Sequence, residues 1–232
     1  MTMPNFPPPR LRLCLDTADA SAWQTWLPIG LFYGVTCNPL LLEQAGVPCT
    51  VATLITLAEQ AFDLGAKEIQ IQTWGDSTAD LVETGERLAA IDRRVVVKIP
   101  ITREGTTAAA QLISRGARVT LTAVYAVHQV LIAAALGAEY VAPYLGRITD
   151  DQGRDGRADL AAMQQALSGV DSSTRILTAS IRQIEDIVFL AQQGLDTFTV
   201  SAAIAAAFFD VAATQSATED FERAARKMSS LP

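Results

Sequence analysis

Eight short runs of β-branched and aliphatic residues recur along this chain, and a longer segment with helical periodicity follows each of them. Strands that alternate with helices form parallel sheets, because each helix returns the chain to the starting edge of the next strand. The alternation therefore predicts an α/β fold. The predicted strands are Leu11–Leu15, Gly34–Cys37, Glu68–Thr73, Val95–Ile99, Val119–Val124, Tyr140–Leu145, Arg175–Ala179 and Thr197–Ser201. The predicted helices are Ala18–Leu27, Val51–Leu64, Ala79–Ala90, Gly105–Arg115, Ala126–Leu136, Ala158–Leu167, Gln183–Gln193 and Ala202–Ala213.

The chain length favours one kind of sheet. Eight units in 232 residues match a (β/α)8 TIM barrel, which typically takes about 250 residues; an open, doubly wound sheet is the alternative. No linker-like change of composition interrupts the series, so residues 11–232 are predicted to form a single barrel domain. An additional C-terminal helix at about Glu219–Met228 either caps the barrel or reaches another subunit. The opening sequence MTMPNFPPPR holds four prolines, so residues 1–10 are predicted to form a flexible tail outside the fold.

Charge and apolar runs exclude several classes of partner. Eighteen Lys and Arg against 25 Asp and Glu give a net charge of −7, whereas nucleic-acid binding needs a basic face. The longest apolar stretches, Val130–Ala138 and Ala202–Phe209, are about half of what a membrane-spanning helix requires. The three cysteines, Cys14, Cys37 and Cys49, show no C-x-x-C spacing, so neither a disulfide framework nor a zinc site is expected. We therefore expect a cytoplasmic protein with no nucleic-acid or membrane partner.

Histidine and metal chemistry are also disfavoured. His128 is the one histidine of the sequence, which excludes His-based triads and two-histidine metal sites. The acidic segment Asp150–Gly156 resembles a calcium loop in composition, but Gly153 and Ala162 stand where an EF-hand loop starting at Asp151 needs Asp or Asn and then Glu. We expect neither a metal nor a cofactor.

In a barrel of this kind the catalytic groups lie at the carboxyl ends of the strands. Polar side chains stand at or just beyond these ends in all eight predicted units. They are Asp16, Thr36, Asn38, Gln72, Lys98, Thr122, Tyr144, Arg147, Ser180, Arg182 and Ser201. Since the carboxyl ends of parallel strands meet at one edge, the sequence predicts a ring of polar groups around one opening.

Lys98 is the most informative member of this ring. It lies in the run Val95-Val96-Val97-Lys98-Ile99-Pro100, which is typical of a strand buried on both faces. Burial disfavours the charged form of an amine, and a neutral amine attacks a carbonyl to form a Schiff base. The alternative is a strand-end lysine that extends to solvent or pairs with Asp16.

Other members of the ring also allow two interpretations. Asp16 either orients substrate hydroxyls and tunes the lysine or caps the following helix. Asn38 precedes a proline, which holds it extended and aims its amide, unless it forms an Asx turn. Arg147 and Arg182 lie where this fold often binds phosphate, unless they form ion pairs with neighbouring carboxylates.

Several short motifs, taken together, resemble the transaldolase family and, within it, the fructose-6-phosphate aldolase branch. The resemblance extends from Leu11 to about Met228, and the joint occurrence of the motifs in this order is specific. They are Leu15-Asp16-Thr17, Gly34-Val35-Thr36-Cys37-Asn38-Pro39, Val96-Val97-Lys98-Ile99-Pro100 with Thr102 and Glu104-Gly105, Thr122-Ala123-Val124-Tyr125, Gly137-Ala138-Glu139-Tyr140-Val141-Ala142-Pro143-Tyr144 with Arg147, and Ala179-Ser180.

The resemblance implies a role for each of the site residues. Lys98 would form the Schiff base. Asp16 and Asn38 would hold the hydroxyls of the carbinolamine and enamine, and Thr36 would line the same pocket. The phosphate of the aldehyde would bind to three further residues, Arg147, Ser180 and Arg182.

Two positions distinguish the branches of the family. In the pattern of the family's transaldolases, Glu stands on the third strand and Phe on the sixth. The matching positions of this chain are Gln72 and Tyr144, which resemble the aldolase branch. By resemblance, Tyr144 is the acid/base group and acts through a water that Gln72 and Thr122 hold. The chain departs from the aldolase pattern at Cys37, where the family usually has threonine, and at Gly146, which resembles the transaldolase form.

The expected activity is that of a class I, metal-independent aldolase that cleaves and forms fructose 6-phosphate from dihydroxyacetone and glyceraldehyde 3-phosphate. A transaldolase, which transfers the dihydroxyacetone unit between sugar phosphates, is the alternative. A phosphosugar-binding barrel without turnover is the rival from another class. The resemblance also implies a homo-oligomer, a pentamer or decamer, in which the C-terminal helix contacts a neighbouring subunit.

Overall fold

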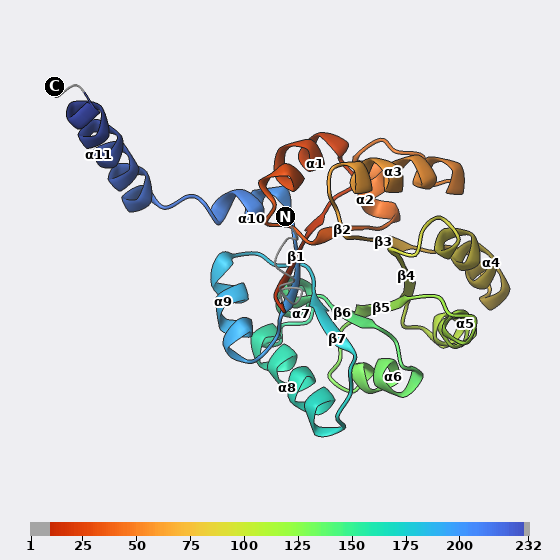
Figure 1. The fold of residues 1–232 in the computed structure, drawn as a ribbon. Helices are drawn as coiled ribbons and strands as arrows, with labels where there is room; N and C mark the ends of the chain where they lie inside the picture. The colour runs from red at the N-terminus through yellow and green to blue at the C-terminus, as the bar shows by residue number, and fades with distance from the viewer. Residues whose placement is uncertain (1–9, 230–232) are drawn as a thin grey trace, which may run out of the picture.

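In the computed structural model, which describes residues 10–229, eight parallel strands close into a barrel in sequence order and helices surround it (Figure 1). The strands are β1 Arg12–Asp16, β2 Gly34–Cys37, β3 Glu68–Gln72, β4 Val95–Pro100, β5 Val119–Val124, β6 Tyr140–Pro143, β7 Arg175–Thr178 and β8 Thr197–Val200. Because β1 pairs with both β2 and β8, the sheet has no free edge. The predicted (β/α)8 barrel is confirmed, and the open doubly wound sheet is excluded. The predicted tail at residues 1–10 lies, except for Arg10, outside the described residues.

The helices between the strands match the predicted segments, with three additions. The predicted helices are α1 Ala20–Trp26, α3 Val51–Asp63, α4 Thr78–Ala89, α5 Arg103–Ser114, α6 Gln129–Leu136, α8 Gly156–Gly169, α9 Ile184–Gln192 and α10 Ala202–Ala207. The additions are the 3-10 helix η1 Leu27–Ile29 and the short helices α2 Pro39–Gln44 and α7 Leu145–Asp150. Helix α2 begins where the Asn38 side chain accepts a hydrogen bond from Leu41 N at 3.1 Å and Pro39 occupies the first helical position. Helix α7 shortens the predicted sixth strand, which ends at Pro143.

The C-terminal boundaries differ from the prediction. The eighth predicted helix ends at Ala207, and α11 spans Ala212–Ser229 rather than beginning at Glu219. The start of α11 contains Thr214, Gln215 and Ser216 and has no apolar periodicity. The sequence therefore predicted that this helix begins later than it does. Helix α11 projects away from the barrel at the end of an extended connection (Figure 1). It is 18 residues long and polar, and no helix in the described part of the chain is long and apolar enough to cross a membrane.

Alternate residues of each strand face the helices and the barrel interior. On β4, Val95, Val97 and Ile99 belong to the core between the sheet and the helices, and none exceeds 2% exposure. Val96 instead packs inside the barrel with Ala142 and other interior residues. Since side chains alternate along a strand, Lys98 also faces the interior. This register places the amine inside the barrel near the carboxyl ends of the strands.

A cluster of polar side chains fills the amino end of the barrel interior. We call Arg12, Glu68, Gln70, Arg118 and Tyr140 the floor cluster. Glu68 is 1% exposed and accepts hydrogen bonds from Gln70 Nε2 at 2.8 Å and from the Tyr140 hydroxyl at 3.0 Å. Arg118 forms an ion pair with Glu68, and Arg12 donates a hydrogen bond to Tyr140. Because this end is filled, ligand access is left to the carboxyl end.

A close backbone approach fixes the end of β4 just beyond Lys98. The Thr102 hydroxyl caps α5 by accepting a hydrogen bond from Gly105 N at 3.0 Å. A Cβ atom at Gly105 would lie 1.9 Å from the Pro100 carbonyl oxygen, and this backbone atom cannot move aside without displacing β4. Glycine is therefore required where α5 starts against the strand.

The substitution Gly105→Ala is expected to lower the free energy of unfolding by about 1–3 kcal/mol, because the new methyl group overpacks a backbone contact. Gly169→Ala is the matched control. It lies at the end of α8, and nothing stands within 4 Å of the added Cβ. Urea unfolding followed by circular dichroism checks both variants. Equal stability of the two variants would contradict the assigned clash.

Candidate active site

A cavity of about 200 Å³ opens at the carboxyl end of the barrel. Seven of the residues predicted from the sequence line it: Asp16, Asn38, Lys98, Tyr144, Arg147, Ser180 and Arg182. Leu40, Leu41, Gln44 and Ala179 complete its wall. A larger hollow of about 470 Å³ lies between α4 and α5 at the amino ends of β4 and β5. The polar ring predicted at the strand ends thus converges on the smaller cavity.

Lys98 lies at the base of this cavity and is 2% exposed. Its neighbours in register are Gln72 on β3 and Thr120 on β5. Within residues 10–229, no hydrogen bond or ion pair joins its ammonium to another side chain. Neither alternative interpretation therefore holds, because the side chain does not reach solvent and does not pair with Asp16. The site presents a buried amine whose charge no carboxylate neutralises directly.

Asp16, the last residue of β1, is held by a chain of hydroxyl groups. Its Oδ1 accepts a hydrogen bond from Thr36 Oγ1 at 2.6 Å, and Thr36 Oγ1 lies 2.7 Å from Thr199 Oγ1. Since a hydroxyl has one proton, which Thr36 donates to the carboxylate, Thr199 is the donor to Thr36. The predicted alternative, a helix cap by Asp16, is wrong, because Asp19 caps α1 instead. The carboxylate is thereby fixed at the cavity wall.

Asn38 combines both predicted interpretations. Its side-chain oxygen caps α2 by accepting from Leu41 N, which is the local turn expected as the alternative. The residue nevertheless lines the cavity. With its oxygen held by the helix, the amide nitrogen keeps its two protons for a ligand.

Tyr144 enters the cavity from the start of α7. Its hydroxyl lies 2.9 Å from Thr122 Oγ1 on β5, and Thr122 is fully buried. The backbone N–H of Tyr144 donates to Val124 O at 3.2 Å, across an irregularity in the β5–β6 register. At that irregularity Ala123 has φ 60°, a conformation that an L-residue adopts only at some energetic cost. The strained backbone supports the phenol–threonine pair.

Among the predicted site residues, Gln72 has the least direct contact with the cavity. It ends β3 in register with Lys98, but it is not among the residues that line the cavity. Thr36 and Thr122 are likewise buried behind the lining residues that they contact. The structure therefore brings Gln72 close to the amine along the sheet without joining it to Tyr144 by a direct hydrogen bond.

Ser180, Arg147 and Arg182 form the outer side of the cavity. Ser180 has φ 59° and is, like Ala123, a strained non-glycine residue at a strand end. Arg182 Nε bonds Asp150 Oδ2 at 3.1 Å, so the predicted alternative of a surface ion pair holds for this arginine. A Cβ at Gly146 would lie 2.5 Å from Ser180 O and 2.6 Å from Arg182 Nε. Glycine at position 146 therefore lets Ser180 and Arg182 approach α7.

Arg147 lies between two phenols. Its guanidinium carbon is 5.1 Å from the centroid of the Tyr144 ring, and its Nη1 is 3.5 Å from the Tyr125 hydroxyl. The hydrogen bond to Tyr125 raises the pKa of the Arg147 guanidinium further. A permanent positive charge therefore stands at the outer side of the cavity of a chain whose net charge is −7.

Two residues that support the site were not assigned a role from the sequence, and one residue that was placed in the polar ring has a different role. Thr199 was missed, although it alternates with Thr197 on β8 and so faces the interior. Tyr125 stands in the Thr122-Ala123-Val124-Tyr125 motif but was given no role, because its place one residue beyond the fifth strand carries no signal for its contacts. Ser201, which was counted in the polar ring, caps α10 by accepting from Ile204 N. Within the described residues, no group of three or more His, Cys, Asp and Glu side chains is placed to hold a metal ion.

Comparisons with known proteins point to one family. A family model described as "Transaldolase/Fructose-6-phosphate aldolase" matches residues 13–231. A protein of Paracoccus denitrificans (strain Pd 1222) described as a probable transaldolase is 29% identical over 211 residues, which are 91% of this chain and 94% of that protein. A protein of Caulobacter sp. (strain K31) with the same description is 31% identical over 211 residues, with the same coverage of both chains. A third, from Brevibacillus brevis, is 29% identical over 194 residues, which are 84% of this chain and 88% of that protein.

The burial of Lys98 leads to a prediction about stability. Lys98→Met is expected to raise the free energy of unfolding by about 1–2 kcal/mol, because it replaces a buried ammonium by an apolar group of similar length. The control Lys67→Met, at an exposed position, is expected to change stability by no more than about 0.5 kcal/mol. Urea unfolding measures both. A destabilised Lys98→Met variant would show that the amine has a structural role.

Proposed function

The chain belongs to the transaldolase/fructose-6-phosphate aldolase family of enzymes, and we propose that it cleaves and forms fructose 6-phosphate by Schiff-base chemistry at Lys98. The observation that carries this proposal is a buried amine in the same cavity as a phenol that is hydrogen-bonded to a threonine. The products of cleavage are dihydroxyacetone and glyceraldehyde 3-phosphate. No metal takes part in the proposed reaction.

The reaction starts at the amine. The neutral Lys98 amine attacks the C2 ketone of fructose 6-phosphate, and the carbinolamine loses water to give an iminium ion. Asp16, fixed by Thr36, accepts hydrogen bonds from the substrate hydroxyls. The side-chain amide of Asn38 donates to them.

Carbon–carbon cleavage follows from removal of one proton. The C4 hydroxyl loses its proton, the C3–C4 bond breaks, and its electron pair moves to the iminium to form an enamine. Tyr144 takes this proton through a water held by Thr122 and Gln72, since a phenol with fixed geometry exchanges protons with an ordered water. Gln72 does not titrate, so its role is to hold that water. The enamine is then protonated at C3 and hydrolysed, which releases dihydroxyacetone.

The phosphate of the aldehyde binds at the outer side of the cavity. Arg147 and Arg182 supply guanidinium groups, which match phosphate oxygens in paired hydrogen bonds. Arg182 does so through its two terminal nitrogens, since its Nε bonds Asp150. Ser180 adds a hydroxyl on a strained backbone that fixes its position. These three residues hold the end of the substrate that leaves as glyceraldehyde 3-phosphate.

Transaldolase activity is the second candidate, and two observations favour it. The relatives compared above are described as probable transaldolases, and Gly146 resembles the transaldolase form. In that reaction the same enamine reacts with a second aldose instead of being protonated. Gln72 and Tyr144 favour the aldolase, because an amide and a phenol there leave the site without the titrating carboxylate of the transaldolase pattern. The fate of the enamine distinguishes the two activities.

Borohydride trapping tests the proposal. Wild-type protein treated with fructose 6-phosphate and borohydride is expected to gain one covalent adduct by intact mass, and Lys98→Met none. Tyr144→Phe is expected to keep the adduct, because imine formation precedes the step that Tyr144 serves, and to lose about 100-fold or more in cleavage rate. Assay of free dihydroxyacetone, with and without erythrose 4-phosphate, follows the enamine. EDTA is expected to leave the rate unchanged.

Each outcome of this experiment has one meaning. An adduct confined to proteins with Lys98, together with free dihydroxyacetone, supports the aldolase. An adduct with transfer to erythrose 4-phosphate and negligible release identifies a transaldolase. Absence of the adduct in wild type rejects both and leaves a phosphosugar-binding barrel.

The thiols fit a cytoplasmic location as part of this proposal. Cys14, Cys37 and Cys49 are free, and Cys49 is exposed. Burial raises the pKa of the Cys37 thiol to about 12, so the residue that departs from the family pattern stays protonated. An exposed free thiol suits a reducing compartment.

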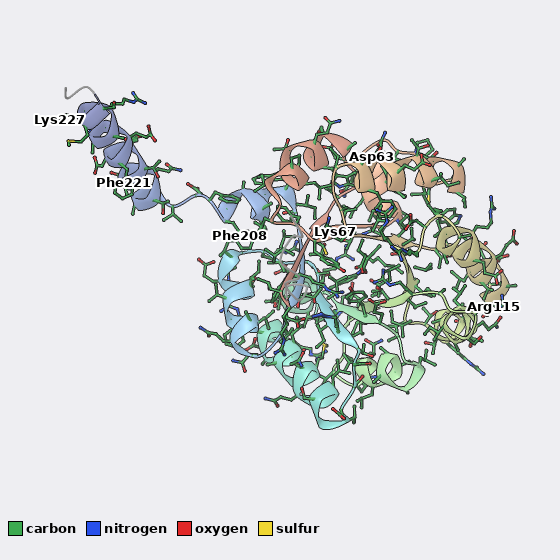
Figure 2. All side chains as sticks on the ribbon, in the orientation of Figure 1. Asp63, Lys67, Arg115, Phe208, Phe221 and Lys227 are labelled. Carbon is green, nitrogen blue, oxygen red and sulfur yellow. The ribbon has the colours of Figure 1, made fainter. Side chains whose placement is uncertain are left out.

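We also propose that the enzyme is a homo-oligomer, a pentamer or decamer, held together through α11. Most helical stability in proteins comes from packing of an apolar face, yet no residue of α11 is buried within its own chain. Phe221 is 72% exposed and Met228 64%, and with Ala217 and Ala224 they follow one face of the helix. Figure 2 shows Phe221 well away from the barrel. A neighbouring subunit of the same chain would bury this stripe.

Light scattering tests the assembly. The wild-type mass is expected to be at least five times the chain mass of 24.8 kDa, and Phe221→Glu is expected to lower it by burying a charge at the interface. Gln215→Glu, which adds the same charge on the opposite face of α11, is the matched control and should leave the mass unchanged. A wild-type monomer at micromolar concentration would contradict the proposal.

A further inference from the structure

Tyr125 contacts two residues of the cavity although it does not line the cavity itself. Its ring meets the Tyr144 ring edge to face, with centroids 5.5 Å apart and an interplanar angle of 87°. Its hydroxyl lies 3.5 Å from Arg147 Nη1. Arg147 in turn lies over the Tyr144 ring at 5.1 Å. The three side chains therefore form a closed triangle, in which each member touches the other two.

The backbone around Tyr125 is held on both sides. Gln129 Oε1 accepts hydrogen bonds from Tyr125 N at 2.9 Å and from Ala126 N at 3.0 Å. The Tyr125 carbonyl accepts from Arg154 Nη1 at 3.0 Å. Two positions before Tyr125, Ala123 adopts its strained φ. Strain of this kind persists only where the surrounding contacts impose it, and here those contacts fix the direction in which the Tyr125 ring leaves β5.

The triangle joins two chemically different parts of the site. Edge-to-face packing prefers a defined orientation of the two rings, so Tyr125 restricts the plane of the Tyr144 phenol while Thr122 holds its hydroxyl at 2.9 Å. A guanidinium over a ring is attracted to its face, and the hydroxyl of Tyr125 accepts a hydrogen bond from the same guanidinium. Movement of Arg147 thus bears on the orientation of Tyr144, both directly and through Tyr125.

We infer that Tyr125 is a positioning residue that couples phosphate binding at Arg147 to the orientation of Tyr144. This inference rests on the proposed function. A substrate phosphate draws Arg147 into one position, and Tyr125 transmits that position to the ring whose hydroxyl moves the proton. Acceptor aldehydes that carry a phosphate are therefore favoured over those without one, beyond the direct attraction of the phosphate to Arg147.

Two substitutions separate the hydroxyl of Tyr125 from its ring. Tyr125→Phe keeps the edge-to-face contact and removes the bond to Arg147, whereas Tyr125→Leu removes both. Tyr33→Phe is the matched control, because Tyr33 lies at the amino end of the barrel, where its ring contacts Arg12 at 4.5 Å. Kinetics in the synthesis direction use dihydroxyacetone as donor and either glyceraldehyde 3-phosphate or glyceraldehyde as acceptor.

Tyr125→Phe is expected to raise KM for glyceraldehyde 3-phosphate about fivefold, as the loss of one hydrogen bond to a charged group would. Its kcat with glyceraldehyde 3-phosphate is expected to fall by more than about twofold, because the Tyr144 ring no longer follows Arg147 through Tyr125, whereas KM and kcat with glyceraldehyde are expected to stay within about twofold of wild type. Tyr125→Leu is expected to lower kcat about tenfold with both acceptors, because the phenol is then misplaced. Both variants should form the borohydride adduct as wild type does, since Lys98 is untouched.

A purely structural role would give a different result. Parallel losses with both acceptors in Tyr125→Phe, or wild-type kinetics in Tyr125→Leu, would overturn the inference. Calorimetric titration with inorganic phosphate adds a measurement that needs no turnover: affinity is expected to fall in Tyr125→Phe and to stay unchanged in Tyr33→Phe. Equal phosphate affinity in all three proteins would overturn the contact with Arg147, whereas absence of the borohydride adduct in wild type would reject the proposed function instead.

Discussion

The burial of the Lys98 amine inside the barrel constrains how the other polar groups of the site are arranged. An ammonium taken from water without a counter-charge is costly, and Lys98 at 2% exposure makes no ion pair within residues 10–229. Asp16, the pairing partner that the sequence offered, is held instead by Thr36 and, behind it, Thr199. The Asp16 carboxylate accepts a hydrogen bond from Thr36, and within residues 10–229 it forms no ion pair with the amine. Asp16 thus bonds Thr36 instead of Lys98, and the Lys98 amine stays available to react.

The interior of the barrel separates this amine from the other buried charges. Glu68 and the arginines of the floor cluster lie at the amino end, and an interior group that includes Val96, Ala142 and Leu177 packs above them. Charges at the two ends of the barrel therefore do not share hydrogen bonds. Strand β6 starts with Tyr140 of the floor cluster and leads into Tyr144, and β4, which carries Lys98, pairs with β3 and β5 beside that cluster. The floor cluster therefore also helps to fix the spacing of the groups around the cavity.

Much of this arrangement follows from the sequence, because strand ends in a parallel barrel converge whatever the details of packing. That rule was enough to place Lys98, Tyr144 and Arg147 at one opening. It could not place α2 and α7, since helices of this length depend on a cap such as Asn38 and on neighbouring backbone contacts rather than on periodicity. Nor could it assign Thr199, because a threonine that supports a carboxylate and one that fills a core look the same in a strand. The role of such a threonine depends on which side chains of distant strands lie beside it.

The floor cluster has a consequence for how the chain folds. Arg12 and Tyr140, which bond within it, are 128 residues apart in sequence, and Glu68 and Tyr140 are 72 apart. Contacts of such sequence separation form late, because the loss of chain entropy precedes their gain. The cluster cannot assemble on a ribosome until six of the eight strands have emerged. Until then Glu68 lacks the hydroxyl of Tyr140, and until the start of β5 has emerged it also lacks Arg118. A nascent chain of up to four strands therefore carries a carboxylate without these partners, and its desolvation opposes collapse into a smaller, incorrectly closed sheet.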